Sequence, residues 1–526
     1  MKAPSITSPK KQIPSSKMKE CLCRSKTVSA GLFITVLLST GSPLFAEPTS
    51  EQHDEKDFNQ ELADMVAEGS STVTDNASFK GLSGRWIPNN HRKMPKGGDW
   101  FNNAGLGLFI HWGPASVYYG SPWVMRGSMK TGELRKPQTT AVEYYSKIDQ
   151  FKPDQFNPEK WFKAAADAGF RYVVLTAKHH DGYTLWPSKH SDFGVQQYYD
   201  GKDLIGRYVK AVRNNSMKVG FYFSGTDWNL QKKSMNFVHA AKDGTIINYK
   251  GEMVDSLPPH SPEMADIKEG HVQELLNNYG KIDLWWWDSG LPIDGKPFLK
   301  NNPDIVINNR GNYRGGEDPG TYPFSHYGTP EGFRHVEWKY AKKAKELNLK
   351  WEVCANSFNR GSGWFYQGRD KASEKLGSLP NTLASLAVVK CWGGNMLLNI
   401  KPRPDGTLTD ATYEAFAKLG RWMKHSGESL FGVDRYGTHY PEKSNVPITK
   451  KENKWYLHHV SSEKDTKLFK ASAAKEIVIQ GMPQIVEVIV LRTGEKPEYS
   501  YENETFRMQA LPPGPDGLHE VIEVKF

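Results

Sequence analysis

The stretch Lys281-Ile282-Asp283-Leu284-Trp285-Trp286-Trp287-Asp288-Ser289-Gly290 contains a short apolar run that follows a Tyr279-Gly280 turn. The run is too short for a helix, and its three adjacent tryptophans favour a strand buried on both faces, as in a parallel sheet. Asp288 then stands at the carboxyl end of this strand, where active sites lie in barrels of alternating strands and helices. A carboxylate beside flat indole rings suits a sugar ligand. Aspartate also caps segments that follow strands, so the position has a structural explanation as well.

Predicted strands and helices alternate on both sides of this run. The pattern predicts further strands over residues 105–110, 171–177, 218–224, 304–309, 349–355 and 396–400. It predicts helices from Pro158 to about 168, over 204–213, over about 263–278 and around 413–423. This alternation indicates a parallel sheet with crossover helices, and the polar strand ends favour a closed barrel over an open sheet. Residues 311–330 contain eight Gly and Pro, so we expect an irregular (β/α)8-like barrel.

The helical period disappears after about residue 432. Short apolar runs separated by turns follow, which predicts a C-terminal antiparallel β-sandwich. A chain of 526 residues is also too long for one compact core. We therefore expect a targeting segment over 1–46, an N-terminal arm over 47–85, a catalytic barrel over 86–431 and a β-sandwich over 432–526.

The first 46 residues have the layout of a secretory signal peptide, because a basic stretch precedes a short apolar run. They carry a net charge of +6 out of the +9 of the whole chain, so the exported chain is nearly neutral and its charge gives no argument for nucleic acid. We expect the mature chain to begin near Glu47 and to be secreted or periplasmic. No later stretch predicts a membrane span, and Cys354 and Cys391 are expected to be buried free thiols.

Polar side chains end four of the predicted strands, at His111, at His179-His180-Asp181, at Tyr222 and at Asp288. Each histidine alone could be an ordinary core residue, but a barrel would bring all four strand ends to one mouth. Adjacent histidines on a strand point to opposite faces, and no cysteine or acidic spacing completes a zinc set, so we expect no metal or other cofactor. A ring of His, Tyr and Trp without glycine-rich phosphate loops favours a polyhydroxylated ligand.

Five segments carry a resemblance to a known family. They are Phe109-Ile110-His111-Trp112-Gly113, Lys178-His179-His180-Asp181-Gly182, Gly220-Phe221-Tyr222-Phe223-Ser224, Trp286-Trp287-Asp288 and Gly393-Gly394-Asn395-Met396-Leu397-Leu398-Asn399-Ile400. In order and spacing they resemble the α-L-fucosidases of glycoside hydrolase family 29, from about Trp100 to Gly432. The β-rich tail is also what that family has.

The resemblance implies a retaining double displacement with Asp288 as the nucleophile. Retention needs a second carboxyl group about 5 to 5.5 Å away that acts first as acid and then as base. Glu331, on a loop at a comparable distance past the nucleophile, is the first choice for this group. Glu352, which matches another family motif within a predicted strand, is the second choice, and Glu317 and Asp318 are outsiders.

The resemblance also implies a set of side chains that bind the sugar: His111, Trp123, His179, His180, Tyr222, Trp286 and Arg310. One departure from the family pattern concerns the loop Ser121-Pro122-Trp123-Val124, where many relatives carry Glu-Trp-Tyr. Pro122 cannot accept the hydrogen bond that a glutamate would take from a sugar hydroxyl, and such a missing partner shifts selectivity. The carbohydrate partner is therefore a fucosylated glycan or, alternatively, an α-L-galactoside or a modified, for example sulfated, fucoside. An inactive sugar-binding protein is the non-enzymatic alternative.

Overall fold

The computed structural model describes residues 93–526, apart from 118–119, 126–127, 131–132, 136–138, 140, 231–236, 241–245, 249–261, 289–294, 311–324, 333–337, 357–362, 369–378 and 461–474. The chain divides into two compact units, residues 1–61 and 62–526, and all described residues belong to the second. The predicted signal peptide and N-terminal arm lie outside the described residues.

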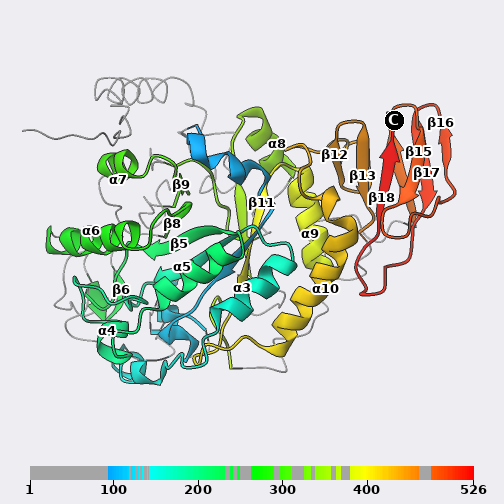
Figure 1. Ribbon diagram of the computed structural model, residues 1–526. Coiled ribbons are helices and arrows are strands. Elements are labelled where there is room, and N and C mark those ends of the chain that lie inside the picture. The colour runs from blue at the N-terminus through cyan, green and yellow to red at the C-terminus, as the bar shows by residue number, and fades with distance from the viewer. Residues whose placement is uncertain are drawn as a thin grey trace, which may run out of the picture. The chain divides into compact units, whose positions relative to one another are not determined.

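A parallel sheet of seven strands forms the centre of the described chain (Figure 1). The strand order is β10-β11-β1-β4-β5-β8-β9, and every neighbouring pair is parallel. The strands are β1 (Leu106–Ile110), β4 (Tyr172–Lys178), β5 (Lys218–Ser224), β8 (Leu284–Asp288), β9 (Val306–Ile307), β10 (Glu352–Ala355) and β11 (Asn395–Ile400). The tryptophan run therefore forms a buried parallel strand, as predicted, and β9 is shorter than the predicted segment.

An irregular segment, Ser325 to Gly332, closes the sheet into a barrel. It bridges the end of β9 on one side, where Asn308 pairs with Tyr327 in parallel. On the other side it bridges the β10 region, where Glu331 pairs with Cys354. Backbone hydrogen bonds run along both seams, from Nα of His326 to the Ile307 carbonyl and from Nα of Cys354 to the Pro330 carbonyl. The segment therefore occupies the eighth strand position of the (β/α)8-like fold.

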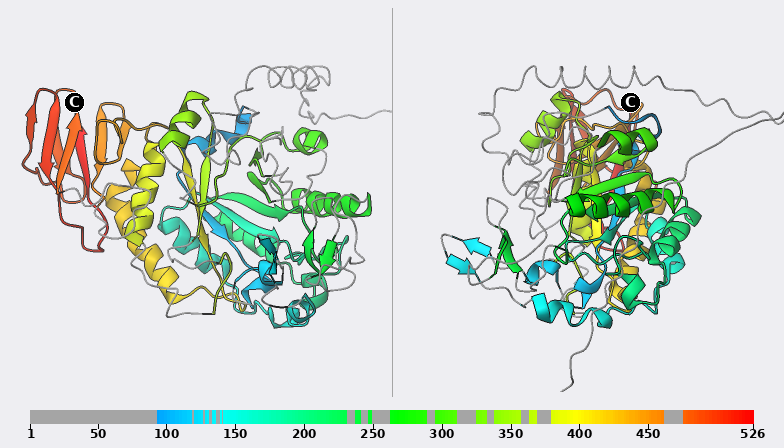
Figure 2. Two further views of the ribbon diagram at one scale, coloured as in Figure 1. Left: turned by 180° about the vertical axis from the view of Figure 1, so that it is seen from behind. Right: turned by 90° about the vertical axis from the view of Figure 1, so that its left-hand side faces the viewer.

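Helices cover the outside of the sheet (Figures 1 and 2). Two of the predicted helices begin with side-chain caps. Asn157 accepts a hydrogen bond from the backbone nitrogen of Lys160 at the start of α3, and Asp203 accepts one from the backbone nitrogen of Gly206 at the start of α5. The α-helices are α2 (Ala141–Tyr145), α3 (Pro158–Asp167), α4 (Val195–Tyr198), α5 (Leu204–Asn214), α6 (Pro262–Asn277), α7 (Gly295–Asn301), α8 (Trp338–Glu346), α9 (Leu379–Cys391) and α10 (Asp410–Ser426).

Two apolar clusters lie on the two sides of the barrel wall, because alternate residues of a strand point to opposite faces. The inner cluster includes Phe109, Tyr222 and Trp286. The outer cluster lies between strands and helices and includes Trp285 and Trp287. Trp286 thus lines the barrel interior directly below Asp288, while its two neighbours pack against the outer layer.

Two antiparallel sheets form the C-terminal part and enclose their own apolar cluster. One has the order β12-β13-β18-β15 and the other β14-β17-β16, so the predicted β-sandwich is confirmed. Their strands are β12 (Ile448–Lys451), β13 (Lys454–His458), β14 (Glu476–Gln480), β15 (Glu487–Val490), β16 (Ser500–Glu502), β17 (Thr505–Gln509) and β18 (Val521–Lys525). The indole of Trp422 on α10 donates a 2.8 Å hydrogen bond to the His519 carbonyl, which ties this part to the barrel.

Smaller hairpins pair β2 (Ser128–Lys130) with β3 (Glu133–Arg135), and β6 (Phe237–Ala240) with β7 (Ile246–Asn248). Cys354 and Cys391 are buried free thiols, as predicted. In the described part of the chain, no helix has the length and apolarity needed to cross a bilayer.

Candidate active site

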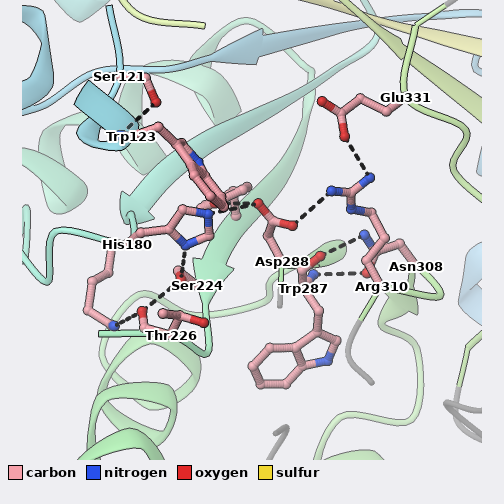
Figure 3. Close-up of polar contacts among 12 residues, drawn as sticks. Ser121, Trp123, His180, Ser224, Thr226, Trp287, Asp288, Asn308, Arg310 and Glu331 are labelled. Atoms are coloured by element: carbon pink, nitrogen blue, oxygen red, sulfur yellow. Dashed lines mark hydrogen bonds and ion pairs between the residues drawn. The ribbon is translucent and has the colours of Figure 1, made fainter. Parts of the chain in front are cut away.

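The carboxyl ends of β1, β4, β5 and β8 bring the predicted polar side chains together at one end of the barrel. Figure 3 shows His180 and Asp288 at this site. The imidazoles of His111 and His179 lie 5.7 Å apart between ring centroids, and His179 stacks on Tyr222 at 5.1 Å. The hydroxyl of Tyr222 donates a 2.7 Å hydrogen bond to Asp288. The four strand ends therefore form one site, and Asp288 lies within it.

Asp288 is held as a carboxylate by its neighbours. Burial alone would raise its pKa, but the charges of Arg310 and His180 and the Tyr222 hydrogen bond outweigh burial and hold the pKa below its ordinary value. Arg310 Nη2 lies 2.9 Å from Asp288 Oδ1. An ionised carboxylate that is partly exposed at a barrel mouth can act as a nucleophile.

Arg310 joins Asp288 to Glu331. Its Nη1 lies 3.2 Å from Glu331 Oε2, while its other terminal nitrogen contacts Asp288 (Figure 3). The guanidinium also lies over the Trp286 ring, 4.9 Å from the ring centroid. The two carboxylates are consequently neighbours within the span of one guanidinium, and Glu331 is the more exposed of the two, with 34% of its side-chain surface accessible against 15% for Asp288.

His180 is oriented by a relay of hydrogen bonds (Figure 3). Ser224 donates its hydroxyl proton to the Thr226 carbonyl at 2.7 Å, so its oxygen accepts from Nδ1 of His180, also at 2.7 Å. The other ring nitrogen, Nε2, faces Asp288 Oδ2 at 3.7 Å. With Nδ1 protonated, Nε2 carries a proton only in the imidazolium form, which is the form that stabilises an ionised Asp288.

His111 has the opposite character. Burial is the main cause that lowers its pKa to about 3, so it is neutral. The amide nitrogen of Asn399 donates to the Trp364 carbonyl, which leaves Asn399 Oδ1 to accept from Nδ1 of His111 at 2.7 Å. Nε2 of His111 therefore keeps a free lone pair, which can accept a hydrogen bond from a sugar hydroxyl. Burial also lowers the pKa of His179 well below its ordinary range.

Glu352 does not share this setting. It begins β10, at the amino end of the strand, and is fully buried inside the barrel. Tyr172 donates to it at 2.5 Å and the Trp286 indole at 3.3 Å. Burial raises its pKa to about 7 against these hydrogen bonds. Glu352 therefore supports Trp286 from below, whereas Glu331 lies beside Asp288 at the mouth.

Trp123 lies at the rim of the site, on a short 3-10 turn formed by Pro122–Met125. Its ring is 49% exposed and meets the imidazole of His180 edge-on at 5.5 Å. It also meets Trp228 edge-on at 5.1 Å. An exposed indole beside the His180 imidazole offers a flat surface to an incoming sugar.

The expectation that His179 and His180 point to opposite faces is wrong. Strand β4 ends at Lys178, so both histidines lie in the turn that follows, where strand alternation no longer applies. Their ring centroids are 4.4 Å apart, and ligand atoms of His179, His180 and Asp288 lie within 4.8 Å of one another. These three residues could hold a metal ion, but such an ion would occupy the carboxylate that the site keeps ionised and accessible.

Asp181 and Asp227, which the sequence places close to the site, turn away from it. Asp181 accepts a 2.7 Å hydrogen bond from Tyr144, and Asp227 forms a buried ion pair with Lys178 at 3.2 Å. Both carboxylates brace the turn after β4 from behind.

Sequence reasoning missed three side chains of the site: Trp228, Trp364 and Asn399. Trp364 tilts over His111 with 4.9 Å between ring centroids. The sequence signal for it was the adjacent aromatic pair Trp364-Phe365 in a segment rich in glycine. Asn399 belongs to a recognised motif, but its contact with His111 spans 288 residues and requires the sheet order.

Taken together, an ionised carboxylate at the end of a barrel strand, a second carboxylate beside it and a wall of aromatic rings define a glycoside hydrolase site. Comparison with known proteins identifies the family. The family model described as Alpha-L-fucosidase matches residues 74–428, and this chain belongs to that family. The chain is accordingly a glycoside hydrolase of the α-L-fucosidase family.

Similar proteins carry the same description. Tissue α-L-fucosidase of Macaca fascicularis is 28% identical over 385 residues, which cover 70% of this chain and 74% of the relative. The human tissue enzyme is 27% identical, with 70% and 75% covered. Among solved structures, α-L-fucosidase isoenzyme 1 of Paenibacillus thiaminolyticus aligns with a TM-score of 0.61 at 25% identity, covering 82% of this chain and 98% of that one.

Two further solved structures show the same fold with bound sugars. The Bacteroides thetaiotaomicron α-L-fucosidase, trapped as a covalent intermediate with 2-fluoro-fucosyl fluoride, has a TM-score of 0.61 at 20% identity and covers 84% of this chain and 98% of its own. The Thermotoga maritima α-fucosidase in complex with fucose has a TM-score of 0.59 at 23% identity, with 82% and 97% covered.

Proposed function

We propose that this protein hydrolyses terminal α-L-fucosyl residues by a retaining double displacement, with Asp288 as the nucleophile and Glu331 as the acid/base. The observation that carries the assignment is the Arg310 bridge, which places both carboxylates at the barrel mouth. In the first step Asp288 attacks the anomeric carbon, and Glu331 gives its proton to the departing oxygen. In the second step Glu331 takes a proton from water, which displaces Asp288.

The site offers a different environment to each carboxylate, as this mechanism requires. Asp288 accepts hydrogen bonds from both Tyr222 and Arg310, which keep it ionised. Glu331 has Arg310 as its charged neighbour and is more exposed, so that it can exchange protons with water. The neutral His111 and the stacked Tyr222 and His179 then line the sugar-binding surface.

The nucleophile is tested with Asp288→Ala. The variant should fold and bind the sugar, yet lose turnover by several orders of magnitude, because the covalent step is gone. Azide should partly restore cleavage of an activated aryl α-L-fucoside and give a product of inverted configuration. Near wild-type activity in Asp288→Ala would refute the assignment.

The acid/base is tested by comparing Glu331→Ala with Glu352→Ala. A general acid matters most when the leaving group is poor. Glu331→Ala should therefore abolish cleavage of natural oligosaccharides while it spares the first step on an aryl fucoside, and azide should accelerate release of the glycosyl-enzyme. Glu352→Ala should depress both substrate types and show no azide effect. A reversed pattern would make Glu352 the acid.

A substrate panel tests the sugar. Chromogenic α-L-fucosides, α-L-galactosides and sulfated fucosides are compared with the wild-type protein, and the α-L-fucoside is expected to be hydrolysed. Preference for the galactoside would reassign the substrate, and sugar binding without any turnover would support the inactive binding protein.

We also propose that the protein is exported and that its mature chain begins near Glu47. The basic and then apolar order of residues 1–46 supports this proposal. N-terminal sequencing of the protein recovered from outside the cytoplasm should find the cleavage near that residue. A recovered chain that retains residues 10–40 would contradict it.

A further inference from the structure

Lys401 follows β11 directly. The ladder between β1 and β11 continues past Ile400, because the His111 backbone nitrogen donates to the Ile400 carbonyl, so the alternation of the strand still applies at Lys401 and places it on the inward face of the barrel. Leu397 packs in the inner cluster, and Ile400 packs in the outer one. Asn399 faces inward, because its side chain contacts His111. Lys401 continues this inward series one layer nearer to the barrel mouth.

The register of the sheet places Lys401 level with His111. Phe109 of β1 pairs with Asn399 of β11, and the His111 backbone nitrogen donates to the Ile400 carbonyl. His111 lies two residues after Phe109, and Lys401 lies two residues after Asn399, so the two residues are level with each other. Their proximity is visible in the pKa of His111, which burial lowers most and the positive charge of Lys401 lowers further.

Among the residues that the structure describes, Lys401 has no acidic partner. Within the described part of the chain, no carboxylate offsets its charge, and burial is the one cause that lowers its pKa to about 8. The other cations of the site are engaged: Arg310 contacts Asp288 and Glu331, and Lys178 pairs with Asp227.

An unpaired, partly buried cation at a ligand site is costly unless a ligand supplies the opposite charge. Its neighbour across the sheet, His111, is neutral, and Asn399, the inward-facing residue before it on β11, carries no charge. Nor does the rim loop Ser121-Pro122-Trp123-Val124 provide a carboxylate. A lysine ammonium is a compact point charge of the kind that binds sulfate and carboxylate groups.

We propose that Lys401 is a specificity residue that binds an anionic substituent of the saccharide substrate, either a sulfate ester or a carboxylate. The proposal rests on the α-L-fucosidase activity proposed above. It extends that activity to a substrate class, namely fucosides that carry negative charge on the terminal fucose or on the neighbouring sugar.

The experiment compares kcat/KM for matched substrates in the wild-type protein and in Lys401→Met. The substrates are a neutral aryl α-L-fucoside, its ring-sulfated forms, and fucosyl disaccharides whose second sugar carries a sulfate or a uronic carboxylate. The wild-type protein should prefer at least one anionic substrate over its neutral counterpart. In Lys401→Met this preference should fall by about 10- to 100-fold, as expected for loss of a charge-assisted hydrogen bond. The anionic substrate that the wild-type protein prefers identifies whether Lys401 binds a sulfate or a carboxylate, and which of the two sugars carries it.

Lys350→Met is the matched control. Lys350 is also a partly exposed lysine whose pKa burial lowers to about 8, but it precedes β10 at the amino end of the barrel. Its replacement should leave the anionic preference unchanged. Lys401→Gln, which keeps a polar side chain, provides a second variant for the case in which methionine prevents folding.

The outcomes separate the two proposals. A wild-type protein that hydrolyses the neutral fucoside but favours no anionic substrate would overturn the role of Lys401 and leave the α-L-fucosidase activity standing. The same conclusion follows if both Lys401 variants keep the wild-type preference. A wild-type protein that hydrolyses no fucoside of either kind would overturn the proposed activity, and the role of Lys401 with it.

Discussion

At the scale of single residues, the site depends on how the neighbours of Asp288 keep its carboxylate ionised. Asp288 is buried enough for its pKa to rise, yet the Arg310 and His180 charges and the Tyr222 hydroxyl reverse that effect. Each of these contacts comes from a different strand end or loop, so the ionised state of Asp288 depends on the assembled barrel. Removal of one contact should therefore change the pH dependence of the enzyme before it changes the fold.

Tyr222→Phe isolates one of these contacts. Activity requires ionised Asp288 and falls as the pH drops through its pKa; loss of the Tyr222 hydrogen bond raises that pKa, so the acidic limb of the kcat/KM profile should move to higher pH. The expected shift is about half to one pH unit for one hydrogen bond. Tyr208→Phe is the control, because the Tyr208 hydroxyl donates to the carbonyls of Val173 and Gly220 rather than to the site. An acidic limb that stays in place would show that Tyr222 does not tune Asp288.

Metal removal tests the cluster of His179, His180 and Asp288. In the proposed mechanism Asp288 acts as an ionised nucleophile without a metal, so treatment with EDTA should leave kcat/KM unchanged. Added zinc should inhibit, because it would bind the same carboxylate. Activity that disappears in EDTA and returns with a divalent ion would instead assign the cluster to a catalytic metal.

At the scale of elements, each strand points every second side chain into the barrel. The inward side chain at the start of β10 is the carboxyl group of Glu352. Burial raises the pKa of Glu352 to about 7, so in the folded protein it stays mostly protonated at pH values below 7. In the unfolded chain it ionises near its ordinary value. The folded protein therefore binds one proton more between pH 4.5 and 7, and stability falls as the pH rises through this window.

Glu352→Gln removes this proton linkage while it retains a polar side chain for Tyr172 and Trp286. The thermal stability of the variant relative to the wild type should improve as the pH rises from 4.5 to 7.5, by up to about 3 kcal/mol. Melting curves of both proteins at the two pH values measure the difference. A stability difference that does not change with pH would mean that Glu352 is not protonated in the fold.

Regular elements were predictable from the sequence, and long-range geometry was not. The Trp285-Trp286-Trp287 run and the capped start of α3 could be predicted, because a strand buried on both faces and a helix N-cap each depend on the identities of neighbouring residues. Arg310 and Glu331 were identified by resemblance, but their shared contact depends on the closure of the barrel by an irregular segment. Likewise, the sequence did not show that β4 ends at Lys178. His179 and His180 therefore lie in a turn with their rings close together, and not on opposite faces of a strand.

At the scale of the whole molecule, the barrel and the C-terminal sheets meet through α10. Trp422 is buried, and its indole donates to the His519 carbonyl. Next to it Arg421 forms an ion pair with Asp516 through an exposed side chain. The two contacts lie side by side but differ in burial, so their contributions to stability should differ as well.

Trp422→Phe keeps an aromatic ring and leaves the buried His519 carbonyl without its donor. It should destabilise the protein by about 1 to 3 kcal/mol and leave kcat/KM unchanged, because the contact is remote from Asp288. Arg421→Ala removes an exposed ion pair and should have the smaller effect. Thermal unfolding of the two variants ranks them. An equal or larger loss in Arg421→Ala would indicate that charge, rather than the buried hydrogen bond, holds the two parts together.

The irregular segment that completes the barrel has a consequence for how such a protein can evolve. Asp288 lies on β8, which pairs in a fixed register with β5 and β9. An extra residue inserted into β8 would therefore displace the proposed nucleophile. Glu331 stands on a segment joined to its neighbours by single bridges and preceded by a long connection after Arg310. Insertions and deletions upstream of Glu331 can accumulate without disturbing the sheet. Enzymes that descend from one ancestor would thus keep the proposed nucleophile at a fixed place in a sequence motif, whereas the proposed acid would be found at varying distances after it.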